Sequence, residues 1–408
     1  MNKFLKEFKD RGFFYQCTNE DELSKLLDKE KINSYIGFDC TAESLHIGSL
    51  LQIMCLRLLQ KHGHRPIVLL GGGTTRIGDP SGKDKTRTIL SEEEIEKNIK
   101  NIEKIIKNFL DNDSSKTKPI FVNNYTWLKD LNYISFLRDI GKHFTINKML
   151  SFDSVKTRLE REQSLSYMEF NYMILQAYDF LELNKKENCV LQMGGSDQWG
   201  NIVNGVDLIK RHSNKQAYGL TTPLITLASG AKMGKTESGA VWLDKKNLTP
   251  YDYWQFWRNI DDRDVLKFLK IFTDLSLEEI EKIKDQNINK LKIVLANETT
   301  SMLHGKGEAK KSEKTAMEAF SENSLGSELP TFSIDKKDLN KVNIIDLILL
   351  SKLEASKSEI RRLIKSKGVK INNQIISDEK LIITKDLFIE NFIKLSIGKK
   401  RHLRVNLT

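Results

Sequence analysis

The sequence predicts a chain of the α/β class, in which a nucleotide-binding sheet is followed by a helical module and a small basic module. The first observation is an ordered series near the start. Residues 32–39 read as a strand, residues 46–63 have helical periodicity, and residues 65–73 form an apolar run that ends in glycines. Strand, turn, helix and strand together make a βαβ unit of a parallel sheet. The other two observations are a change to helical periodicity after Pro250 and an excess of Lys and Arg beyond Lys341.

Length and composition indicate a folded protein. A chain of 408 residues with 39% hydrophobic residues is long enough for two or three domains with substantial cores. No apolar run approaches the roughly 20 residues that span a bilayer, and the charged opening segment lacks the apolar stretch of a signal peptide. We therefore expect a cytoplasmic location. The four cysteines form no CxxC or Cys/His cluster, so neither a disulfide framework nor a zinc site is expected.

The net charge of +10 is concentrated in one part of the chain. From Lys341 to Thr408 there are 15 Lys and Arg residues against 7 Asp and Glu residues. Such a surplus favours a polyanionic partner, although a solvated basic surface explains charge alone equally well.

Further elements follow from periodicity. Residues 164–183 have a long helical pattern that precedes an apolar strand at 189–195, and residues 221–227 are another strand candidate. Residues 321–340 have weak periodicity and are expected to be a linker.

Two short motifs indicate phosphate chemistry when they are taken as an ordered pair: HIGS at 46–49 and KMGKT at 232–236. His46 follows a predicted βα turn, where backbone N–H groups at a helix N-terminus can bind phosphate, and Gly48 allows a nucleotide to approach closely. Lys232 and Lys235 lie in a glycine-containing loop and can reach a departing pyrophosphate. Either motif alone is better explained as a capping histidine or a basic surface loop. Their order and spacing favour the functional interpretation.

A mixed polar stripe on the helix at 164–183 indicates a binding pocket. Tyr172, Gln176 and Asp179 recur at spacings of four and three, so they project from one helix face. The alternative is a satisfied polar face at an interface.

The two motifs resemble the HIGH and KMSKS signatures of class I aminoacyl-tRNA synthetases. Longer stretches at 35–50, 69–83, 172–180 and 192–202 resemble the tyrosine-specific members, the bacterial-type tyrosyl-tRNA synthetases, and the resemblance runs from Phe4 through the rest of the chain. It implies activation of L-tyrosine with ATP to tyrosyl adenylate and pyrophosphate, and then transfer of tyrosine to the 3′ end of tRNA(Tyr).

The resemblance also implies an architecture. It comprises a Rossmann-type catalytic domain for ATP and tyrosine over residues 1–248, an α-helical anticodon-binding-type domain over 249–320, the linker over 321–340, and a small α+β S4-like RNA-binding domain over 341–408. A homodimer is expected, and Mg²⁺ is expected to accompany ATP without a dedicated protein metal site.

The resemblance assigns roles residue by residue. Tyrosine would contact Tyr35, Asp79, Tyr172, Gln176, Asp179 and Gln198. ATP would contact Gly37, Asp39, His46, Gly48, Ser49, Gly195, Asp197, Lys232 and Lys235. The catalytic contacts would come from Thr41, His46, Lys83, Arg87, Lys232 and Lys235. Tyr35 and Asp179 would receive the phenolic hydroxyl and would therefore reject phenylalanine, a discrimination that is well known in this family.

Some positions depart from the family pattern. Ser49 stands where the signature has a second histidine, Gly234 where many class I enzymes have serine, and Cys40 where proline is usual. Ile36 occupies a position that is sometimes a nucleotide-contacting cysteine. These differences affect the expected ATP affinity and not the reaction class.

The basic end of the chain has its own pattern. Residues 351–376 contain a capping pair, Ser356 and Glu359, a helix, Gly368 as its stop, and an alternating strand with an NNQ turn. This resembles an S4-like RNA-binding module, with the exposed basic residues Lys357, Arg361, Arg362 and Lys365 as RNA contacts.

Three alternatives stay open at this point. A tryptophanyl-tRNA synthetase shares the fold and both signatures. A catalytically inactive RNA-binding or regulatory protein on the same scaffold is a second possibility, and an S4-tailed RNA-modifying enzyme is a third.

Overall fold

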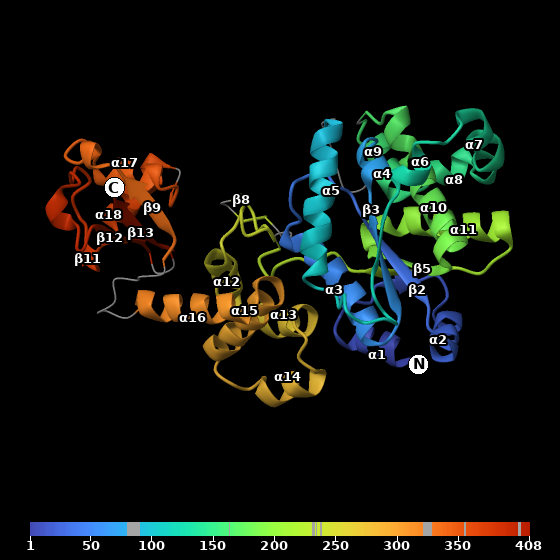
Figure 1. The fold of residues 1–408 in the computed structure, drawn as a ribbon, viewed down its shortest axis with the longest axis horizontal. Coiled ribbons are helices and arrows are strands. Elements are labelled where there is room, and N and C mark those ends of the chain that lie inside the picture. Colours follow the sequence, from blue (N-terminus) through green and yellow to red (C-terminus); the bar gives the residue numbers. More distant parts are fainter. Residues whose placement is uncertain are drawn as a thin grey trace. The chain divides into compact units, whose positions relative to one another are not determined.

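The computed structural model describes most of the chain (Figure 1), namely residues 1–79, 90–162, 164–230, 233, 235–236, 239–320, 329–354, 356–398 and 401–408. Contacts divide it into two compact units, which are described separately. Unit 1 comprises Met1–Leu248 and Ile260–Leu295, and unit 2 comprises Thr249–Asn259 and Ala296–Thr408. No helix in the described part of the chain is both long and apolar enough to cross a membrane.

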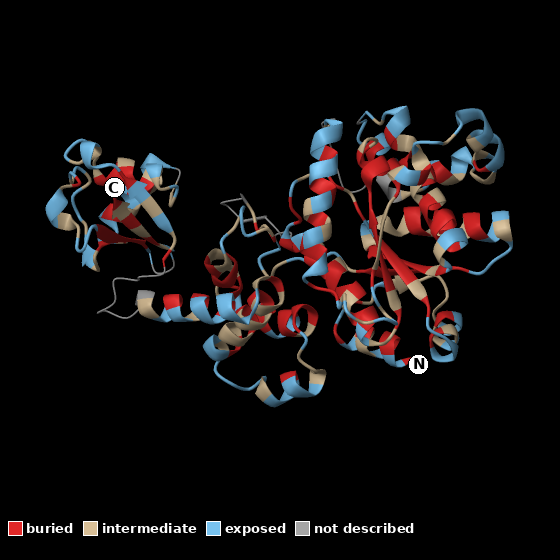
Figure 2. Cartoon of the chain, in the orientation of Figure 1, coloured by how far each residue is buried: buried red, intermediate tan, exposed pale blue. Residues whose placement is uncertain are grey.

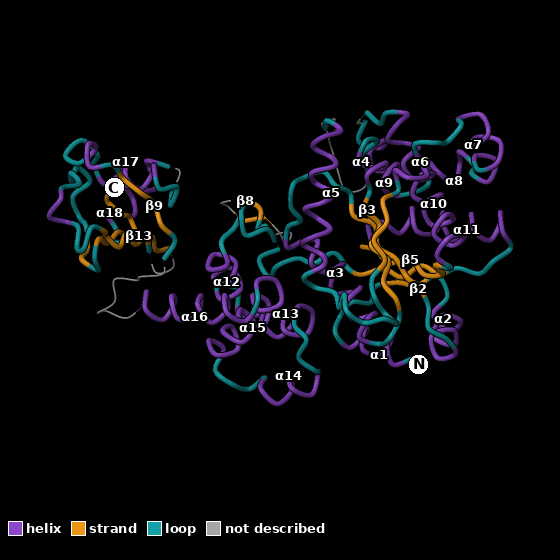
Figure 3. The backbone as a smooth tube through the Cα atoms, viewed as in Figure 1, coloured by secondary structure: helices purple, strands orange, loops and turns teal. Residues whose placement is uncertain are grey.

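A six-stranded sheet forms the centre of unit 1. Its strands in chain order are β1 Gln16–Cys17, β2 Asn33–Phe38, β3 Arg65–Leu70, β4 Ile120–Asn123, β5 Cys189–Gly195 and β6 Tyr218–Thr222. The spatial order is β1-β6-β5-β2-β3-β4, and all neighbours are parallel except β1 and β6. Figure 3 shows these strands running through the middle of unit 1 with helices around them.

The helices of unit 1 are mostly crossovers or covers. They are α1 Lys3–Asp10, α2 Glu20–Lys29, α3 Ile47–Lys61, α4 Gly72–Thr75, α5 Glu92–Lys107, α6 Tyr125–Leu128, α7 Tyr133–Asp139, α8 Ile146–Leu150, α9 Asp153–Glu160, α10 Tyr167–Glu187, α11 Trp199–Ser213, α13 Val265–Phe272 and α14 Leu277–Ile283. A two-stranded ribbon pairs β7 Lys235–Thr236 with β8 Gly239–Ala240. Helix α15, Ile288–His304, continues from unit 1 into unit 2.

The strand order places helices on both faces of the sheet. From β2 the chain moves through α3 to β3, whereas from β5 it moves in the opposite direction through α11 to β6. Because parallel crossovers are right-handed, these two helices must lie on opposite faces. The order reverses beside β2, and ligands of open α/β sheets bind at the carboxyl ends of the strands at such a point.

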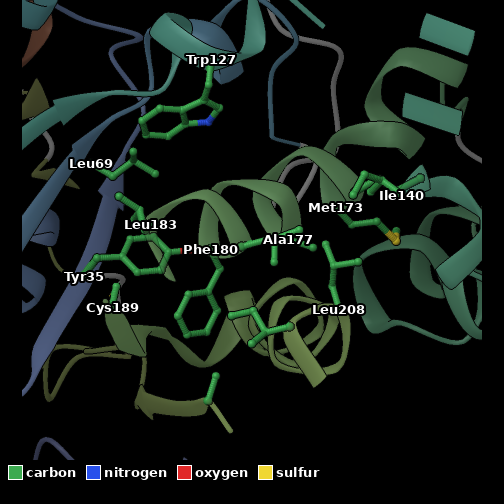
Figure 4. Packing of buried hydrophobic residues seen from close by; sticks show 14 of the residues in the cluster. Tyr35, Leu69, Trp127, Ile140, Met173, Ala177, Phe180, Leu183, Cys189 and Leu208 are labelled. Atoms are coloured by element: carbon green, nitrogen blue, oxygen red, sulfur yellow. The ribbon is translucent and has the colours of Figure 1, made fainter. Parts of the chain in front are cut away.

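One apolar cluster packs α10 and α11 against the sheet. It contains Tyr35 and Leu69 from the sheet, Phe180 from α10 and Leu208 from α11, all buried. The rings of Tyr35 and Phe180 lie with centroids 5.3 Å apart, and Figure 4 shows them side by side with Trp127 nearby. Figure 2 shows the buried residues concentrated along the strands.

Helix ends follow the sequence signals in several places. Helix α3 ends before Gly63, whose φ of +81° suits glycine. Ser91 and Glu94 form a capping box at the start of α5, as predicted. The prediction of a strand at 221–227 is wrong in position, because β6 begins at Tyr218 and ends at Thr222. Pro223 follows directly and has no N–H group to extend the sheet.

Residues 260–295, which were expected in a separate helical domain, group with unit 1. Helix α13 contacts α3, and the guanidinium of Arg11 caps its C-terminal end. Arg11 donates to the carbonyl oxygens of Lys270 at 2.7 Å, Thr273 at 3.3 Å and Leu275 at 2.7 Å. A cation at a helix C-terminus satisfies otherwise unpaired carbonyl groups.

Unit 2 contains a helical part and a C-terminal module. The helical part has α12 Pro250–Arg258, the second half of α15, and α16 Lys306–Phe320. The C-terminal module, residues 329–408, has a five-stranded sheet in the order β11-β10-β12-β13-β9. Its elements are β9 Thr331–Ile334, α17 Ile344–Leu350, α18 Lys357–Lys365, β10 Val369–Ile371, β11 Gln374–Ile375, β12 Phe392–Ile397 and β13 Arg401–Leu407.

Two local details of the C-terminal module differ from expectation. Part of the predicted linker is a strand, since β9 pairs in parallel with β13 and Ile334 is buried in the module core. The strand was missed because it has only four residues, which is too short for an alternating apolar pattern to be distinguished from a linker. Helix α18 ends as predicted near Gly368, but the left-handed residue is Lys367, with φ +60°.

Candidate active site

A cavity of about 460 Å³ lies where the strand order reverses. It is lined by the ends of β2 and β5, the start of α3, and one face of α10. The predicted stripe of Tyr172, Gln176 and Asp179 on α10 faces this cavity. The structure therefore brings together residues that are more than 130 positions apart, such as Asp39 and Tyr172.

Asp179 is the most deeply buried acidic residue of the cavity, with 1% of its surface exposed. The indole Nε1–H of Trp127 donates to its Oδ1 at 2.8 Å, and the amide of Asn124 donates to its Oδ2 at 2.9 Å. Burial raises the pKa of Asp179 to about 7, although the two hydrogen bonds oppose the shift. The free protein therefore holds a carboxyl group that titrates near neutral pH.

Tyr35 on β2 is buried beside this acid. Tyr35 lines the cavity, and its hydroxyl has no hydrogen-bond partner among the described residues. Burial, and then the charge of Asp179, raises the pKa of the Tyr35 phenol well above its ordinary value. A buried hydroxyl without a partner is costly, so this position favours a ligand that supplies one.

A second group of polar contacts surrounds the other part of the cavity. The hydroxyl of Tyr172 donates to Oδ2 of Asp39 at 3.0 Å. The amide of Gln198 donates to Oδ2 of Asp79 at 2.9 Å, and Oε1 of Gln176 accepts from Asn201 at 2.9 Å. Acceptors from several elements therefore line this part of the cavity, which suits a cationic group such as an ammonium.

The first signature motif forms the start of α3. His46 is the N-cap residue, and its Nδ1 accepts from the backbone N–H of Gly48 at 3.0 Å. In the neutral ring this acceptance leaves the proton on Nε2, which can donate to an anion. A Cβ at Gly48 would lie 2.7 Å from Cε1 of the His46 ring, so the ring occupies the space that any larger residue would need.

Backbone pairing joins the two signature motifs. The segment after β8 runs beside the first motif. The backbone N–H of Ile47 donates to the carbonyl oxygen of Val241 at 2.8 Å, and the backbone N–H of Leu243 donates to the carbonyl oxygen of Leu45 at 2.9 Å. Met233, inside the second motif, is buried and lines the same cavity. The two motifs, nearly two hundred positions apart, thus meet at one site.

Most candidate residues that the structure describes lie on the cavity wall. They are Tyr35, Gly37, Asp39, His46, Gly48, Ser49, Asp79, Tyr172, Gln176, Asp179, Gly195, Asp197 and Gln198. Thr41 is exposed and is not part of the lining. Lys83, Arg87 and Lys232 lie outside the described residues, and Lys235 is described only in its backbone.

Comparisons with known proteins decide the family. The model of the family "tRNA synthetases class I (W and Y)" matches residues 27–321, and that of "Tyrosine–tRNA ligase SYY-like C-terminal domain" matches 321–405. The tyrosine–tRNA ligase of Pelagibacter ubique (strain HTCC1062) is 80% identical over 408 residues and covers 100% of both chains. The chain belongs to the class I tyrosine–tRNA ligases. The prediction of a tyrosine-specific member is therefore confirmed.

Other relatives agree with this assignment. The tyrosine–tRNA ligase of Wolbachia pipientis subsp. Culex pipiens (strain wPip) is 54% identical over 410 residues, which cover 99% of this chain and 97% of that protein. The crystal structure of a C-terminally truncated Aspergillus nidulans mitochondrial tyrosyl-tRNA synthetase has a TM-score of 0.70 and 30% identity. The match covers 78% of this chain and 94% of that chain. The predicted α/β class I fold is thus confirmed.

The four predicted RNA contacts lie on the surface of α18. Lys357, Arg361, Arg362 and Lys365 are all exposed. Three of them approach carboxylates: Lys357 lies 3.4 Å from Asp346, Arg361 3.7 Å from Glu379, and Arg362 3.5 Å from Glu359.

The sequence patterns did not identify Trp127 and Asn124 as residues of the site. Both follow β4, and residues after the carboxyl end of a parallel strand line the crevice of an α/β sheet. That rule could have found them if the short strand at Ile120–Asn123 had been recognised.

Proposed function

We propose that the chain, as a member of the tyrosine–tRNA ligases, binds L-tyrosine and ATP side by side in this cavity. It forms tyrosyl adenylate and pyrophosphate there and then transfers tyrosine to the 3′ end of tRNA(Tyr). The observation that carries the proposal is the buried pair of Tyr35 and Asp179. The hydroxyl of Tyr35 has no hydrogen-bond partner within the described part of the chain, and Asp179 supplies a carboxyl group.

Tyr35 and Asp179 recognise the substrate's phenolic hydroxyl. The carboxylate accepts the phenolic proton and the Tyr35 hydroxyl donates to the phenolic oxygen, so both buried groups gain partners. Phenylalanine would leave them unpaired at the cost of desolvated polar groups. Trp127 and Asn124 orient Asp179 from behind.

Asp79, Tyr172 and Gln176 hold the ammonium group, and Gln198 contacts the reacting carboxylate of tyrosine. Their support is the group of acceptor oxygens around the second part of the cavity. Fixing the ammonium group at one end and the hydroxyl at the other orients the substrate carboxylate towards ATP.

ATP lies against the first signature motif. Nε2 of His46 donates to a phosphate oxygen, and the nucleotide contacts residues that line the same wall: Gly37, Asp39, Gly48, Ser49, Gly195 and Asp197. The tyrosine carboxylate is already ionised and attacks the α-phosphorus, the bond to the bridging oxygen breaks, and pyrophosphate leaves. No general base is required, so catalysis rests on positioning and on donors placed where charge develops.

Four basic residues stabilise the departing pyrophosphate. They are Lys83, Arg87, Lys232 and Lys235, proposed from the family resemblance, and Thr41 is proposed as a further contact on the same ground. Mg²⁺ accompanies ATP through the phosphates. The described residues contain no group of three His, Cys, Asp or Glu side chains arranged for a metal.

The domains divide the work as the resemblance implies. Residues 1–248 carry the chemistry. Residues 249–320, of which 260–295 group with unit 1, supply the anticodon-binding-type helices. Residues 341–408 belong to an S4-like RNA-binding domain, and strand β9 shortens the linker proposed between 321 and 340. The RNA contacts assigned to it are Lys357, Arg361, Arg362 and Lys365, and the protein works in the cytoplasm.

The enzyme acts as a homodimer through an apolar face of unit 1. Ile134 is 70% exposed and Tyr167 66% exposed, with Tyr133, Leu137 and Met168 also exposed nearby on α7 and α10. Such a patch on one face is typical of an interface. Changing Ile134 to Glu should shift the sedimentation coefficient towards that of a monomer.

Pyrophosphate exchange with each of the twenty amino acids tests the proposed reaction. We expect ATP–pyrophosphate exchange with tyrosine and none above background with phenylalanine or tryptophan. Exchange that depends on another amino acid, or on none, would contradict the proposal.

A further inference from the structure

Residues 223–229, which follow β6 and which we call the approach segment, lie along the cavity wall. Leu224 and Ile225 line the cavity, and so does Met233 inside the second signature motif. The backbone N–H of Met233 donates to the carbonyl oxygen of Ile225 at 3.2 Å. The carbonyl oxygen of Met233 lies so close to the first motif that a Cβ at Gly48 would be 3.1 Å from it. The approach segment therefore helps to set where the second motif meets the first.

A tight turn lies at the end of the approach segment. The backbone N–H of Gly230 donates to the carbonyl oxygen of Leu227 at 2.8 Å, which closes a β-turn with Ala228 and Ser229 at its centre. The N–H group of the second turn residue takes no part in that bond, so the N–H of Ala228 needs a partner elsewhere. Oδ2 of Asp264 accepts from it at 2.7 Å.

Asp264 makes this contact instead of capping its own helix. It ends the 3-10 turn Asp262–Asp264 and is the N-cap residue of α13, with 4% of its surface exposed. An N-cap aspartate ordinarily accepts from a backbone N–H in the first turn of its helix. The side chain of Asp264 makes no such bond with α13, all of whose residues the structure describes. Its bond to the approach segment therefore accounts for a buried carboxylate that helix capping does not explain.

Helix α13 gives this bond a fixed base. The guanidinium of Arg11 holds the C-terminal end of the helix, and the helix contacts α3, which begins with the first signature motif. Phe272 of α13 also lines the cavity. One turn after Asp264, the amine of Lys267 donates to the carbonyl oxygen of Thr226 at 3.3 Å. Two side chains of one helix therefore hold two backbone groups of the approach segment, and Asp264 is the buried one of the two.

We propose that Asp264 is a positioning residue for adenylate formation. By accepting from the N–H of Ala228 it fixes the approach segment, and the bond between Met233 and Ile225 carries that constraint to the second motif. The inference rests on the proposed role of the second motif at the departing pyrophosphate. Donors must already be in place where charge develops, and a displacement of about 1 Å can cost on the order of a hundredfold in rate.

Three substitutions in the full-length protein test this role. Asp264→Ala removes the acceptor, Asp264→Asn keeps an oxygen that can accept from Ala228, and Asp262→Ala is a control that removes an exposed aspartate of the same turn. Single-turnover kinetics measure tyrosyl-adenylate formation, and equilibrium binding measures tyrosine affinity. We expect Asp264→Ala to slow adenylate formation by about tenfold and to change the tyrosine Kd by less than about twofold. Asp264→Asn and Asp262→Ala should stay within about threefold of the parent rate.

A substitution on the other side of the bond decides the matter if Asp264→Ala does not fold. Ala228 is the second residue of the β-turn, a position that proline favours, so Ala228→Pro removes the N–H group and remains compatible with the turn. It should slow adenylate formation by a factor similar to that of Asp264→Ala. Because both changes break the same bond, the double variant should be no slower than the slower single variant. Circular dichroism shows which variants are folded.

The outcomes separate this inference from the proposed reaction. A parent protein that forms no adenylate with tyrosine would contradict the reaction itself. With an active parent protein, parent-like rates in folded Asp264→Ala and Ala228→Pro would overturn the positioning role. Equal losses in Asp264→Ala and Asp264→Asn would overturn it as well, and so would losses that multiply in the double variant. A slower rate that comes entirely from weaker tyrosine binding would also contradict it.

Discussion

The active-site cavity and the C-terminal module use polar residues in opposite ways. In the cavity, Tyr35 and Asp179 are buried, and Trp127 and Asn124 hold the carboxyl group of Asp179 at hydrogen-bond distance. In the C-terminal module the interior is apolar, and most of the basic side chains lie at the surface. A small substrate is distinguished by desolvated hydrogen bonds, whereas a large polyanion is held by many cations that act at longer range.

This difference implies different tolerance to change. A shift of about 1 Å in the cavity can cost on the order of a hundredfold in rate. Loss of one surface cation lowers RNA affinity in a graded way. The following variants test that division, from the largest expected effect to the smallest.

Removal of the C-terminal module tests the contribution of the cavity without that of the module. A chain ending at Phe320 keeps every described residue of the cavity, whereas a cut near Asn340 would leave β9 without its partner β13. We expect pyrophosphate exchange to change by less than about threefold and tRNA charging to fall by on the order of a thousandfold. Normal charging by the shortened chain would place the RNA contacts in the remaining part. The Aspergillus nidulans relative was crystallised in a C-terminally truncated form.

Asp179→Asn tests the buried acid. The amide cannot accept from both Trp127 and Asn124 while also binding the phenolic proton, so kcat/KM for tyrosine should fall by on the order of a hundredfold. Pyrophosphate exchange measures this loss. A fall of less than about threefold would show that Asp179 is not the phenol acceptor.

The same variant has a pH signature. The pKa of Asp179 is about 7 in the folded protein, against an ordinary value of 3.8, so the folded state binds this proton more strongly. Its contribution to stability is complete below about pH 4 and is lost as pH rises towards 7. The stability of Asp179→Asn relative to the parent protein should therefore rise between pH 5 and pH 8, as measured by urea unfolding. A constant difference would contradict the raised pKa.

Gly48→Ala tests the contact between backbone and signature histidine. The added Cβ would lie 2.7 Å from the His46 ring and 3.1 Å from the carbonyl oxygen of Met233, so the ring must move. We expect a loss of roughly ten- to a hundredfold in adenylate formation, because Nε2 is displaced from the phosphate. Gly230→Ala is a control with open space at the Cβ, although its φ of +82° adds some backbone strain. Adenylate formation at the parent rate in Gly48→Ala would exclude a tight fit at this position.

Tyr35→Phe should have the smallest effect. It removes one neutral hydrogen bond to the substrate, which is worth about 0.5–1.5 kcal/mol, so kcat/KM for tyrosine should fall by up to about tenfold. Activity with phenylalanine should change little. Thermal stability should not fall, because the hydroxyl has no hydrogen-bond partner among the described residues. An equal loss for both amino acids would make Tyr35 a packing residue.

Sequence reasoning succeeded where residue type and spacing act together. The helix face of Tyr172, Gln176 and Asp179 follows from periodicity alone, and the meeting of the two signature motifs follows from their order in a βαβ fold. It could not find the residues that orient Asp179. Trp127 and Asn124 lie more than fifty positions from that acid, in and directly before the four-residue helix α6, which is too short to show periodicity.

The C-terminal module shows the same limit from another side. Counting charges identified the basic region, but which basic residues share one face of the sheet depends on strand register. Lys394 and Arg404 become neighbours only through pairing of β12 with β13, and no pattern within either strand indicates it. Strand β9 was taken for a linker for a similar reason, because its partner lies far along the chain.

The pairing of β9 with β13 also has a consequence for the order of folding. The carbonyl oxygen of Ile334 accepts from the Thr408 hydroxyl, 74 positions later. Contacts of such separation close slowly, whereas α17 with α18 and the β12–β13 hairpin can form locally. During synthesis β9 leaves the ribosome first among the strands of this sheet, yet it is the last that can find its partner. Until then its unpaired edge is the part of the nascent module most open to proteases and to pairing with other chains.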